Sequence, residues 1–224
     1  MNRTLTSVIW ILALLVALTL GAANLFLGEL NQDEGWYLYA ARLVSEGQRP
    51  YRDFAFTQAP LLPMVYGLAY PLTGEGGVGA GRALTMGLSL LAAGFAGALA
   101  RRLVSREMKG WALACAFALA AVNVYQSYYG TVVKTYALCG FLLTAGAWLL
   151  AVARDRRSLV VHALAGLFLA GAAGTRISAG VMLPVLGLYL MGQRERSGRA
   201  SWLAFAVGGF VGLGVIFLPL IFAA

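Results

Sequence analysis

Long apolar segments separated by short polar loops constrain this chain more than any other feature. They occupy residues 7–27, 83–100, 111–125, 136–153, 159–174, 177–191 and 202–222. An α-helix needs about 20 apolar residues to cross the hydrocarbon core of a bilayer, within a range of about 17–25. The shortest segments, 111–125 and 177–191, fall below that range. The pattern predicts an all-α polytopic membrane protein with about seven transmembrane helices, built as one domain over residues 1–224.

Composition supports this class, because only 12% of the residues are charged and 60% are hydrophobic. A soluble globular domain carries roughly 25% charged residues. The first apolar segment is too long for the core of a signal peptide, and it ends in Asn24-Leu-Phe-Leu-Gly-Glu29 without a small-residue cleavage site. We therefore expect it to be retained as a transmembrane helix.

The charged residues of the loops predict the orientation, because Lys and Arg accumulate on the cytoplasmic side of a membrane. Alternate loops form two sets. The first set holds eleven cations and three acids: Arg3, Arg101, Arg102, Arg106, Lys109, Arg154, Arg156, Arg157, Arg194, Arg196 and Arg199 against Glu107, Asp155 and Glu195. The second set has no net charge. The N-terminus is therefore predicted to be cytoplasmic, and the net charge of +8 requires no nucleic-acid partner.

Cysteine and histidine often build metal or redox sites, but the three such residues of this chain are placed unfavourably for that use. Cys115 and Cys139 each lie within an apolar run, and His162, the only histidine, has no second ligand candidate nearby. We interpret both cysteines as small buried hydrophobic residues. A histidine-based metal site or catalytic triad is excluded.

Residues 31–70 stay half polar in a chain that is otherwise apolar, within a predicted outer loop of about 28–81. Six of the nine acids lie in or beside this stretch: Glu29, Asp33, Glu34, Glu46, Asp53 and Glu75. Asn31 and Glu34 have the spacing of a capping box, which predicts a helix start. Gly47 and Pro50 end that helix. Its polar stripe (Arg42, Ser45, Glu46 and Arg49) favours an interfacial position.

A second element begins after Pro60. Its apolar run, residues 61–72, is too short to span a bilayer and contains Pro63 and Pro71. We expect a second interfacial or re-entrant helix here.

Asp33 has two interpretations from its local sequence. A carboxylate in the first turn of a helix is stabilised as an anion by the helix dipole, and it can accept a proton from a hydroxyl group. Alternatively, Asp33 and Glu34 only cap the helix and remain solvated.

Several motifs in this order resemble the GT-C glycosyltransferases that use polyprenyl-phosphate donors. They are Asp33-Glu34 after the first span, Tyr51-Arg-Asp-Phe54, Gln58-Ala-Pro-Leu-Leu62, Lys134-Thr-Tyr-Ala-Leu138 and Gly171-Ala-Ala-Gly-Thr-Arg176. The chain is most similar to bacterial members akin to protein mannosyltransferases, aminoarabinose lipid A transferases and lipopolysaccharide-core galacturonosyltransferases. The resemblance covers roughly residues 5–195.

The resemblance implies an enzyme that transfers one sugar from a polyprenyl-phosphate donor to an acceptor hydroxyl group, with inversion at the anomeric carbon. It implies catalysis by Asp33, with Glu34 beside it, on the extracytoplasmic face of the bacterial inner membrane. Arg176 would contact the donor phosphate, and Lys134, Arg52 and Arg82 are further candidates because they share the predicted face of Asp33. Tyr37, Asp53 and Gln58 are assigned to the substrate-binding loop. Acceptors in the family are glycans, lipids or proteins.

The sequence departs from the family pattern at three places. Gln58-Ala-Pro60 stands where a basic triplet such as Lys-Pro-Pro is common, and Lys134 replaces an acid. The family usually continues beyond a seventh span, whereas this sequence stops at Ala224. We therefore expect either a truncated enzyme or one that needs a partner subunit.

Two other functions and one cofactor are compatible with the sequence. The chain is alternatively a non-catalytic membrane subunit, or a lipid or solute transporter, although a transporter would place more polar groups near the bilayer midplane. Some GT-C enzymes use a divalent metal, and Asp33 with Asp53 would be its ligands here. No cofactor is otherwise predicted.

Overall fold

The computed structural model describes residues 3–193 and 199–221, and within them it contains helices and no strand. The α-helices are α1 (Arg3–Leu27), α2 (Gln32–Ser45), α3 (Leu61–Thr73), α4 (Gly77–Ala100), α5 (Lys109–Ala121), α6 (Val124–Tyr129), α7 (Thr135–Arg156), α8 (Leu159–Thr175), α9 (Met182–Gly192) and α11 (Arg199–Ile221). Two short 3-10 helices, η1 (Gly74–Gly76) and η2 (Ile177–Val181), precede α4 and α9. The all-α prediction is confirmed for these residues.

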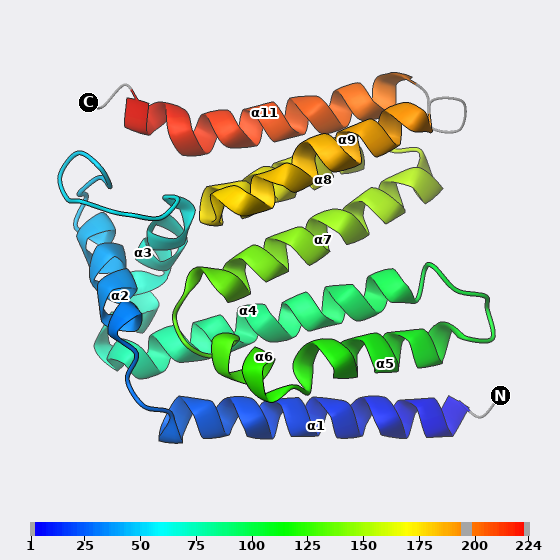
Figure 1. Ribbon diagram of the computed structural model, residues 1–224, viewed down its shortest axis with the longest axis horizontal. Coiled ribbons are helices and arrows are strands. Elements are labelled where there is room, and N and C mark those ends of the chain that lie inside the picture. The colour runs from blue at the N-terminus through cyan, green and yellow to red at the C-terminus, as the bar shows by residue number, and fades with distance from the viewer. Residues whose placement is uncertain (1–2, 194–198, 222–224) are drawn as a thin grey trace.

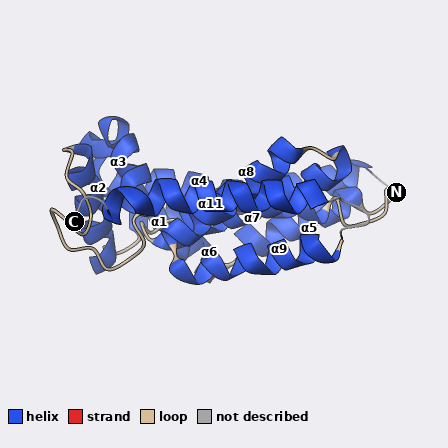
Figure 2. Ribbon diagram, turned by 90° about the horizontal axis from the view of Figure 1, so that it is seen from above, coloured by secondary structure: helices blue, strands red, loops and turns tan. Residues whose placement is uncertain are grey.

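The long helices lie side by side along the longest axis of the molecule, and α2 and α3 stand across one end of them (Figures 1 and 2). Helix α8 packs against α7 and α11, while α4 packs against α5 and α7, and α1 packs against α5. Helix α1 begins at the end opposite α2 and α3, where the loops that follow α4 and α7 also lie (Figure 1). These cation-rich loops therefore share one end of the bundle, as the charge pattern predicts.

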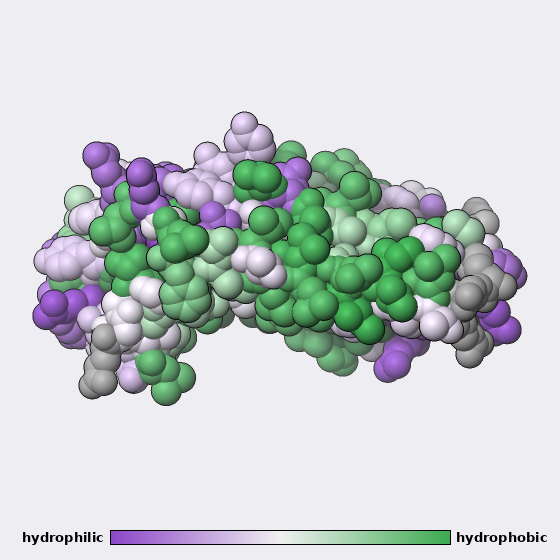
Figure 3. Space-filling view, turned by 90° about the horizontal axis from the view of Figure 1, so that it is seen from below, coloured by the Kyte–Doolittle hydropathy of each residue, from purple (hydrophilic) through white to green (hydrophobic). Residues whose placement is uncertain are grey.

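Four of the described helices are long and apolar enough to cross a membrane. They are Thr4–Leu27, Gly77–Ala100, Thr135–Arg156 and Arg199–Leu220. On the face that α1 covers, hydrophobic side chains occupy the middle and hydrophilic ones gather toward both ends (Figure 3). These features indicate a membrane-embedded helical protein. The remaining apolar helices have 10–17 residues, so the count of seven spans stays a prediction.

Three predicted spans differ most from the structure in their boundaries. The second begins at Gly77, six residues earlier than predicted. The third is not one helix, because α5 ends at Ala121 and Asn123 is extended. The Asn123 side chain accepts hydrogen bonds from the backbone N–H groups of Tyr125 and Gln126, and this caps the separate helix α6. The sixth is divided between η2 and α9.

Both helices predicted in the first outer loop are present. Helix α2 begins with the expected capping box. The Glu34 side chain accepts a hydrogen bond from the Asn31 backbone N–H, and the Asn31 side chain accepts one from a backbone N–H group in the first turn of the helix. The helix ends at Ser45, and Gly47 then adopts a φ of 87° that favours glycine. Helix α3 begins directly after Pro60.

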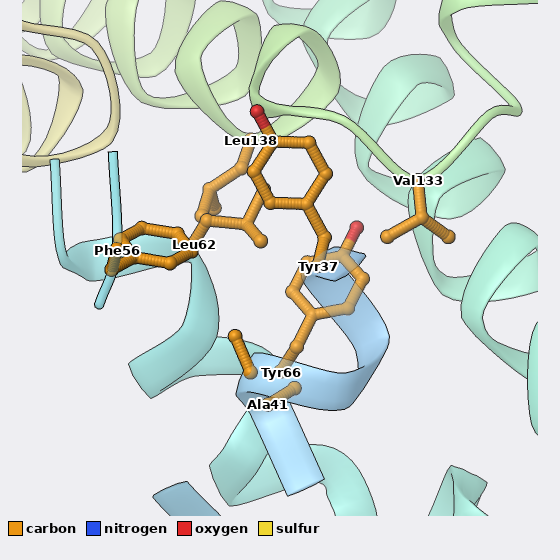
Figure 4. Close-up of a cluster of buried hydrophobic side chains, with 8 residues drawn as sticks. Tyr37, Ala41, Phe56, Leu62, Tyr66, Val133 and Leu138 are labelled. Carbon is orange, nitrogen blue, oxygen red and sulfur yellow. The ribbon is translucent and has the colours of Figure 1, made fainter. Parts of the chain in front are cut away.

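A buried hydrophobic cluster joins α2 and α3 to the bundle (Figure 4). Tyr37 comes from α2, and Leu62 and Tyr66 come from α3. Val133 comes from the loop before α7, and Leu138 comes from the first turn of α7. The Tyr66 hydroxyl group also lies 2.7 Å from the Thr85 hydroxyl group of α4. This packing fixes the N-terminus of α2 beside the N-terminus of α7.

The cysteine prediction is correct for one residue and wrong for the other. Cys139 is buried, whereas Cys115 on α5 is exposed. His162 is buried, and its Nδ1 atom lies 2.7 Å from the Ser158 carbonyl oxygen.

Candidate functional site

The N-terminus of α2 is attached to α6 as well as to α1. The Asn31 backbone N–H donates to the Glu34 carboxylate at 3.0 Å, and the Asn31 side-chain oxygen accepts from the Asp33 N–H at 3.1 Å. The Asn31 amide also donates to the Tyr128 hydroxyl group at 3.3 Å. These bonds direct two adjacent carboxylates to different surroundings, Glu34 inward and Asp33 outward.

Glu34 is completely buried and forms a two-point ion pair with Arg82 of α4. Arg82 Nε lies 2.8 Å from Glu34 Oε1, and Arg82 Nη2 lies 2.7 Å from Glu34 Oε2. The remaining guanidinium N–H groups donate to the carbonyl oxygens of Asn24, Gly28 and Glu29 at 2.7–3.1 Å. Every N–H direction of Arg82 is thus used within the protein, as burial of a cation requires.

The same carboxylate reaches the loop before α7. Glu34 Oε1 accepts a hydrogen bond from the Val133 N–H at 3.1 Å. Burial alone would raise the pKa of Glu34, but the hydrogen bonds from Arg82 and from the backbone N–H groups of Asn31 and Val133 lower it overall. Glu34 and Arg82 are therefore enclosed structural partners. This position does not support the predicted roles of Glu34 in catalysis and of Arg82 in phosphate binding.

Asp33 and Lys134 form a second, more accessible ion pair. Lys134 Nζ lies 2.7 Å from Asp33 Oδ2. The Asp33 side chain is 58% exposed and the Lys134 side chain is 16% exposed. The hydrogen bond to Asp33 raises the pKa of the Lys134 ammonium group, which keeps it charged. Lys134 directly precedes α7 and follows Val133. The two ion pairs are therefore neighbours, since Asp33 is next to Glu34 in α2 and Lys134 is next to Val133, which donates to Glu34.

Arg176 follows the C-terminus of α8 and lies beside the start of α7. Its guanidinium carbon lies 4.6 Å from the centre of the Tyr136 ring, and its Nη1 atom lies 3.4 Å from the Thr135 hydroxyl oxygen. A cation over an aromatic face is attracted by the ring quadrupole. Tyr136 also contacts Tyr129, and Tyr129 contacts Tyr128, with ring centres 5.1 Å apart in each pair.

Tyr37 connects these groups electrostatically. Burial raises the pKa of Tyr37, the charge of Asp33 raises it further, and the charges of Lys134 and Arg176 act in the opposite direction. We use the name outer cluster for Asp33, Tyr37, Lys134, Tyr136 and Arg176. One exposed carboxylate, two cations and two phenols thus meet at the end of an apolar bundle.

The structure does not bring Arg52, Asp53 or Gln58 into the outer cluster. Arg52 Nε and Asp53 Oδ1 lie 2.8 Å apart in an exposed turn, where Asp53 also accepts from the Arg49 N–H at 2.8 Å. The Gln58 residue is exposed, and its backbone carbonyl oxygen accepts a hydrogen bond from the Tyr51 hydroxyl group. Arg52 and Asp53 largely neutralise each other.

Sequence reasoning named Tyr37 but missed Tyr136, the second aromatic residue of the outer cluster. Tyr136 is two residues from Lys134, and the run Tyr125-Gln-Ser-Tyr-Tyr129 precedes it closely. This density of tyrosines beside a loop cation was a usable signal, although interfacial aromatic belts produce the same pattern.

The two proposed metal ligands have separate partners, since Asp33 contacts Lys134 and Asp53 contacts Arg52. Within residues 3–193 and 199–221, no three His, Cys, Asp or Glu residues are grouped as metal ligands.

Comparisons with known proteins assign no family: no protein-family model matches the chain, and neither a curated protein nor a solved structure gives a significant match.

Proposed function

We propose that this protein is a membrane glycosyltransferase that transfers a sugar from a polyprenyl-phosphate donor to an acceptor hydroxyl group. The observation that supports it best is the outer cluster, where the Asp33 carboxylate lies 2.7 Å from Lys134 and Arg176 stands over Tyr136. Such a transfer needs a proton acceptor and fixed cations for a phosphate leaving group. Both are present at one end of a membrane-embedded bundle.

The proposed reaction is a single displacement at the anomeric carbon. The acceptor oxygen forms a bond to that carbon while the bond from the carbon to the phosphate oxygen breaks. The acceptor proton moves to the Asp33 carboxylate, and polyprenyl phosphate leaves with the bonding electron pair. Attack opposite the leaving group inverts the configuration. Lys134 and Arg176 stabilise the charge that develops on the phosphate.

The Asp33–Lys134 ion pair adds one step to this scheme. The donor phosphate competes with Asp33 for the Lys134 ammonium group, because both are anions near the same cation. Binding of the donor therefore releases the Asp33 carboxylate, which is already 58% exposed, for the acceptor. Glu34 and Arg82 hold α2, α4 and the segment before α7 in register during this exchange.

The active site is proposed to face the extracytoplasmic side of a bacterial inner membrane. This proposal is supported by the position of the outer cluster, which lies at the end of the bundle opposite the cation-rich loops that follow α4 and α7 (Figure 1). The partners of this reaction are the polyprenyl-phosphate sugar, the lipid bilayer, and an acceptor that is a glycan, a lipid or a protein.

The test is sugar transfer in membranes that contain the Asp33→Asn variant and a radiolabelled polyprenyl-phosphate sugar. We expect transfer to fall by about 10²–10⁴-fold while the protein level holds. Glu46→Gln is the control, because Glu46 is an exposed carboxylate at the end of α2 that forms an ion pair with Arg42 and lies outside the outer cluster. Full transfer by Asp33→Asn would reject Asp33 as the base.

A second candidate is a non-catalytic membrane subunit, and the two ion pairs favour it. Both acids in the first turn of α2 already have a basic partner, Arg82 for Glu34 and Lys134 for Asp33, as in a purely structural joint. Purified chain that transfers no sugar alone, but restores transfer to a co-purifying glycosyltransferase, would support this candidate instead.

A further inference from the structure

Two grooves flank the start of α5, at the end of the bundle opposite the outer cluster. One has a volume of about 440 Å³ and lies between α4, α5 and α7, with Ala98, Leu113 and Trp148 in its wall. The other, of about 480 Å³, lies between α1 and α5 and is lined by Trp10 and Ile11. Helix α5 has 13 residues and is much shorter than its neighbours α1 and α4, which have 25 and 24 residues.

Two cations stand between the grooves. Arg101 at the end of α4 and Lys109 at the start of α5 line both of them, as does Leu113. Neither cation forms an ion pair with any residue in the ranges 3–193 and 199–221. Arg102 differs, because it pairs with Asp155 and its guanidinium carbon lies 6.0 Å from the Trp148 ring centre.

The charge and polarity of the grooves define their ligand. Three cations (Arg101, Arg102 and Lys109) face one acid, Asp155, which leaves two positive charges. Apolar side chains that line the grooves (Trp10, Ile11, Ala98 and Trp148) belong to helices α1, α4 and α7, which are long enough to span a membrane. A phosphate beside hydrocarbon satisfies both features, whereas a free anion would leave the apolar walls unused.

We propose that Arg101 and Lys109 bind the phosphate of an anionic phospholipid whose hydrocarbon chain lies along Leu113 in these grooves. The site is independent of the proposed sugar transfer, because it lies at the other end of the bundle. It would anchor the short helix α5 between α1, α4 and α7.

The test measures lipid retained by the full chain in native mass spectrometry, with phosphatidylglycerol and phosphatidylcholine as probes. We expect wild type to retain phosphatidylglycerol more strongly than phosphatidylcholine. The double variant Arg101→Ala/Lys109→Ala should lose affinity for phosphatidylglycerol by about 10-fold or more, since each cation near a lipid surface contributes substantially. Equal retention of the two lipids by wild type would overturn the proposal.

A matched double variant, Arg106→Ala/Arg157→Ala, also removes two positive charges from this end of the bundle. Both residues are exposed and line neither groove. It should retain phosphatidylglycerol as wild type does. An equal loss in both double variants would show diffuse surface attraction and reject the site.

Two further measurements remove the remaining ambiguities. The charge-preserving variant Arg101→Lys/Lys109→Arg should keep phosphatidylglycerol binding, which separates loss of charge from loss of folding. If this variant loses binding while its helical circular dichroism spectrum is unchanged, the proposed phosphate contact is wrong. Inorganic phosphate should not displace the lipid. Displacement at comparable concentrations would reject the contribution of the apolar grooves.

Discussion

The Glu34 carboxylate and the Arg82 guanidinium group meet in two hydrogen bonds of 2.8 and 2.7 Å across 48 residues of sequence. Neither side chain is accessible, with exposed fractions of 0% and 4%. Through the Val133 N–H, the same pair also holds the segment that carries Lys134. One buried ion pair therefore links α1, α2, α4 and the start of α7, and so determines where the outer cluster forms.

Removal of one partner from this pair should destabilise the fold strongly. Glu34→Ala leaves the buried Arg82 charge without its counterion, which costs about 3–5 kcal/mol of unfolding free energy. The measurement is thermal unfolding of the detergent-purified chain. The Arg42–Glu46 pair is the control because it is exposed, with side-chain fractions of 58% and 45%. Glu46→Ala should lower the unfolding temperature much less than Glu34→Ala, because an exposed ion pair is screened by solvent. Equal shifts would contradict the assigned role.

Acid should weaken the fold through Glu34. Its pKa in the folded chain is lower than the ordinary value of 4.5. Burial raises the pKa, but the hydrogen bonds from Arg82 and from the backbone N–H groups of Asn31 and Val133 together outweigh that effect. The stabilisation is therefore complete above pH 4.5 and is lost as the pH falls further, through the folded-state pKa.

The measurement for this second prediction is the unfolding temperature of wild type and Glu34→Gln, from neutral pH to below 4.5. The variant has no carboxylate to protonate at this position. The gap between the two proteins should therefore narrow in acid. A gap that stays constant would show that Glu34 does not titrate with unfolding.

Local patterns were sufficient to predict the first turn of α2. Asn31 and Glu34 are three residues apart, and their hydrogen bonds close within one helical turn, so no distant partner is needed. The apolar lengths likewise predicted helices, because backbone groups in hydrocarbon must bond within their own segment.

Long-range partners were beyond such patterns. Glu34 meets Val133 across 99 residues, and a single sequence carries no sign of that pairing. Arg82 was therefore predicted to bind the donor phosphate, although Glu34 and three carbonyl oxygens occupy its N–H groups. The break at Asn123 was missed for another reason: the apolar run continues across it, and only the side-chain cap divides it into two helices.

Close packing of α8 against α11 should depend on glycine. A Cβ atom on Gly208 would come 1.9 Å from the Ala163 carbonyl oxygen, so Gly208→Ala must separate the two helices. We expect a loss of about 1–3 kcal/mol, measured by thermal unfolding. Gly94→Ala in α4 is the matched control, because nothing lies within 4 Å of its Cβ position. Similar shifts in both variants would contradict this packing.

The two cations of the outer cluster should affect transfer much more than stability. Lys134→Gln and Arg176→Gln each remove a positive charge from the developing phosphate, and we expect the transfer rate to fall by about 10²–10³-fold. Unfolding temperatures should change little, since the Asp33–Lys134 pair is partly exposed. The assay is the radiolabelled sugar transfer described above.

Arg49→Gln is the control for these cation variants, because Arg49 is an exposed cation of the same outer loop that follows α2 and lies outside the outer cluster. It should transfer sugar at the wild-type rate. The Michaelis constant for the donor separates two roles of Lys134. If Lys134 contacts the donor phosphate already in the bound ground state, Lys134→Gln raises that constant; if it acts only on the leaving phosphate, the catalytic rate alone falls. Unchanged values of both would exclude Lys134 from the reaction.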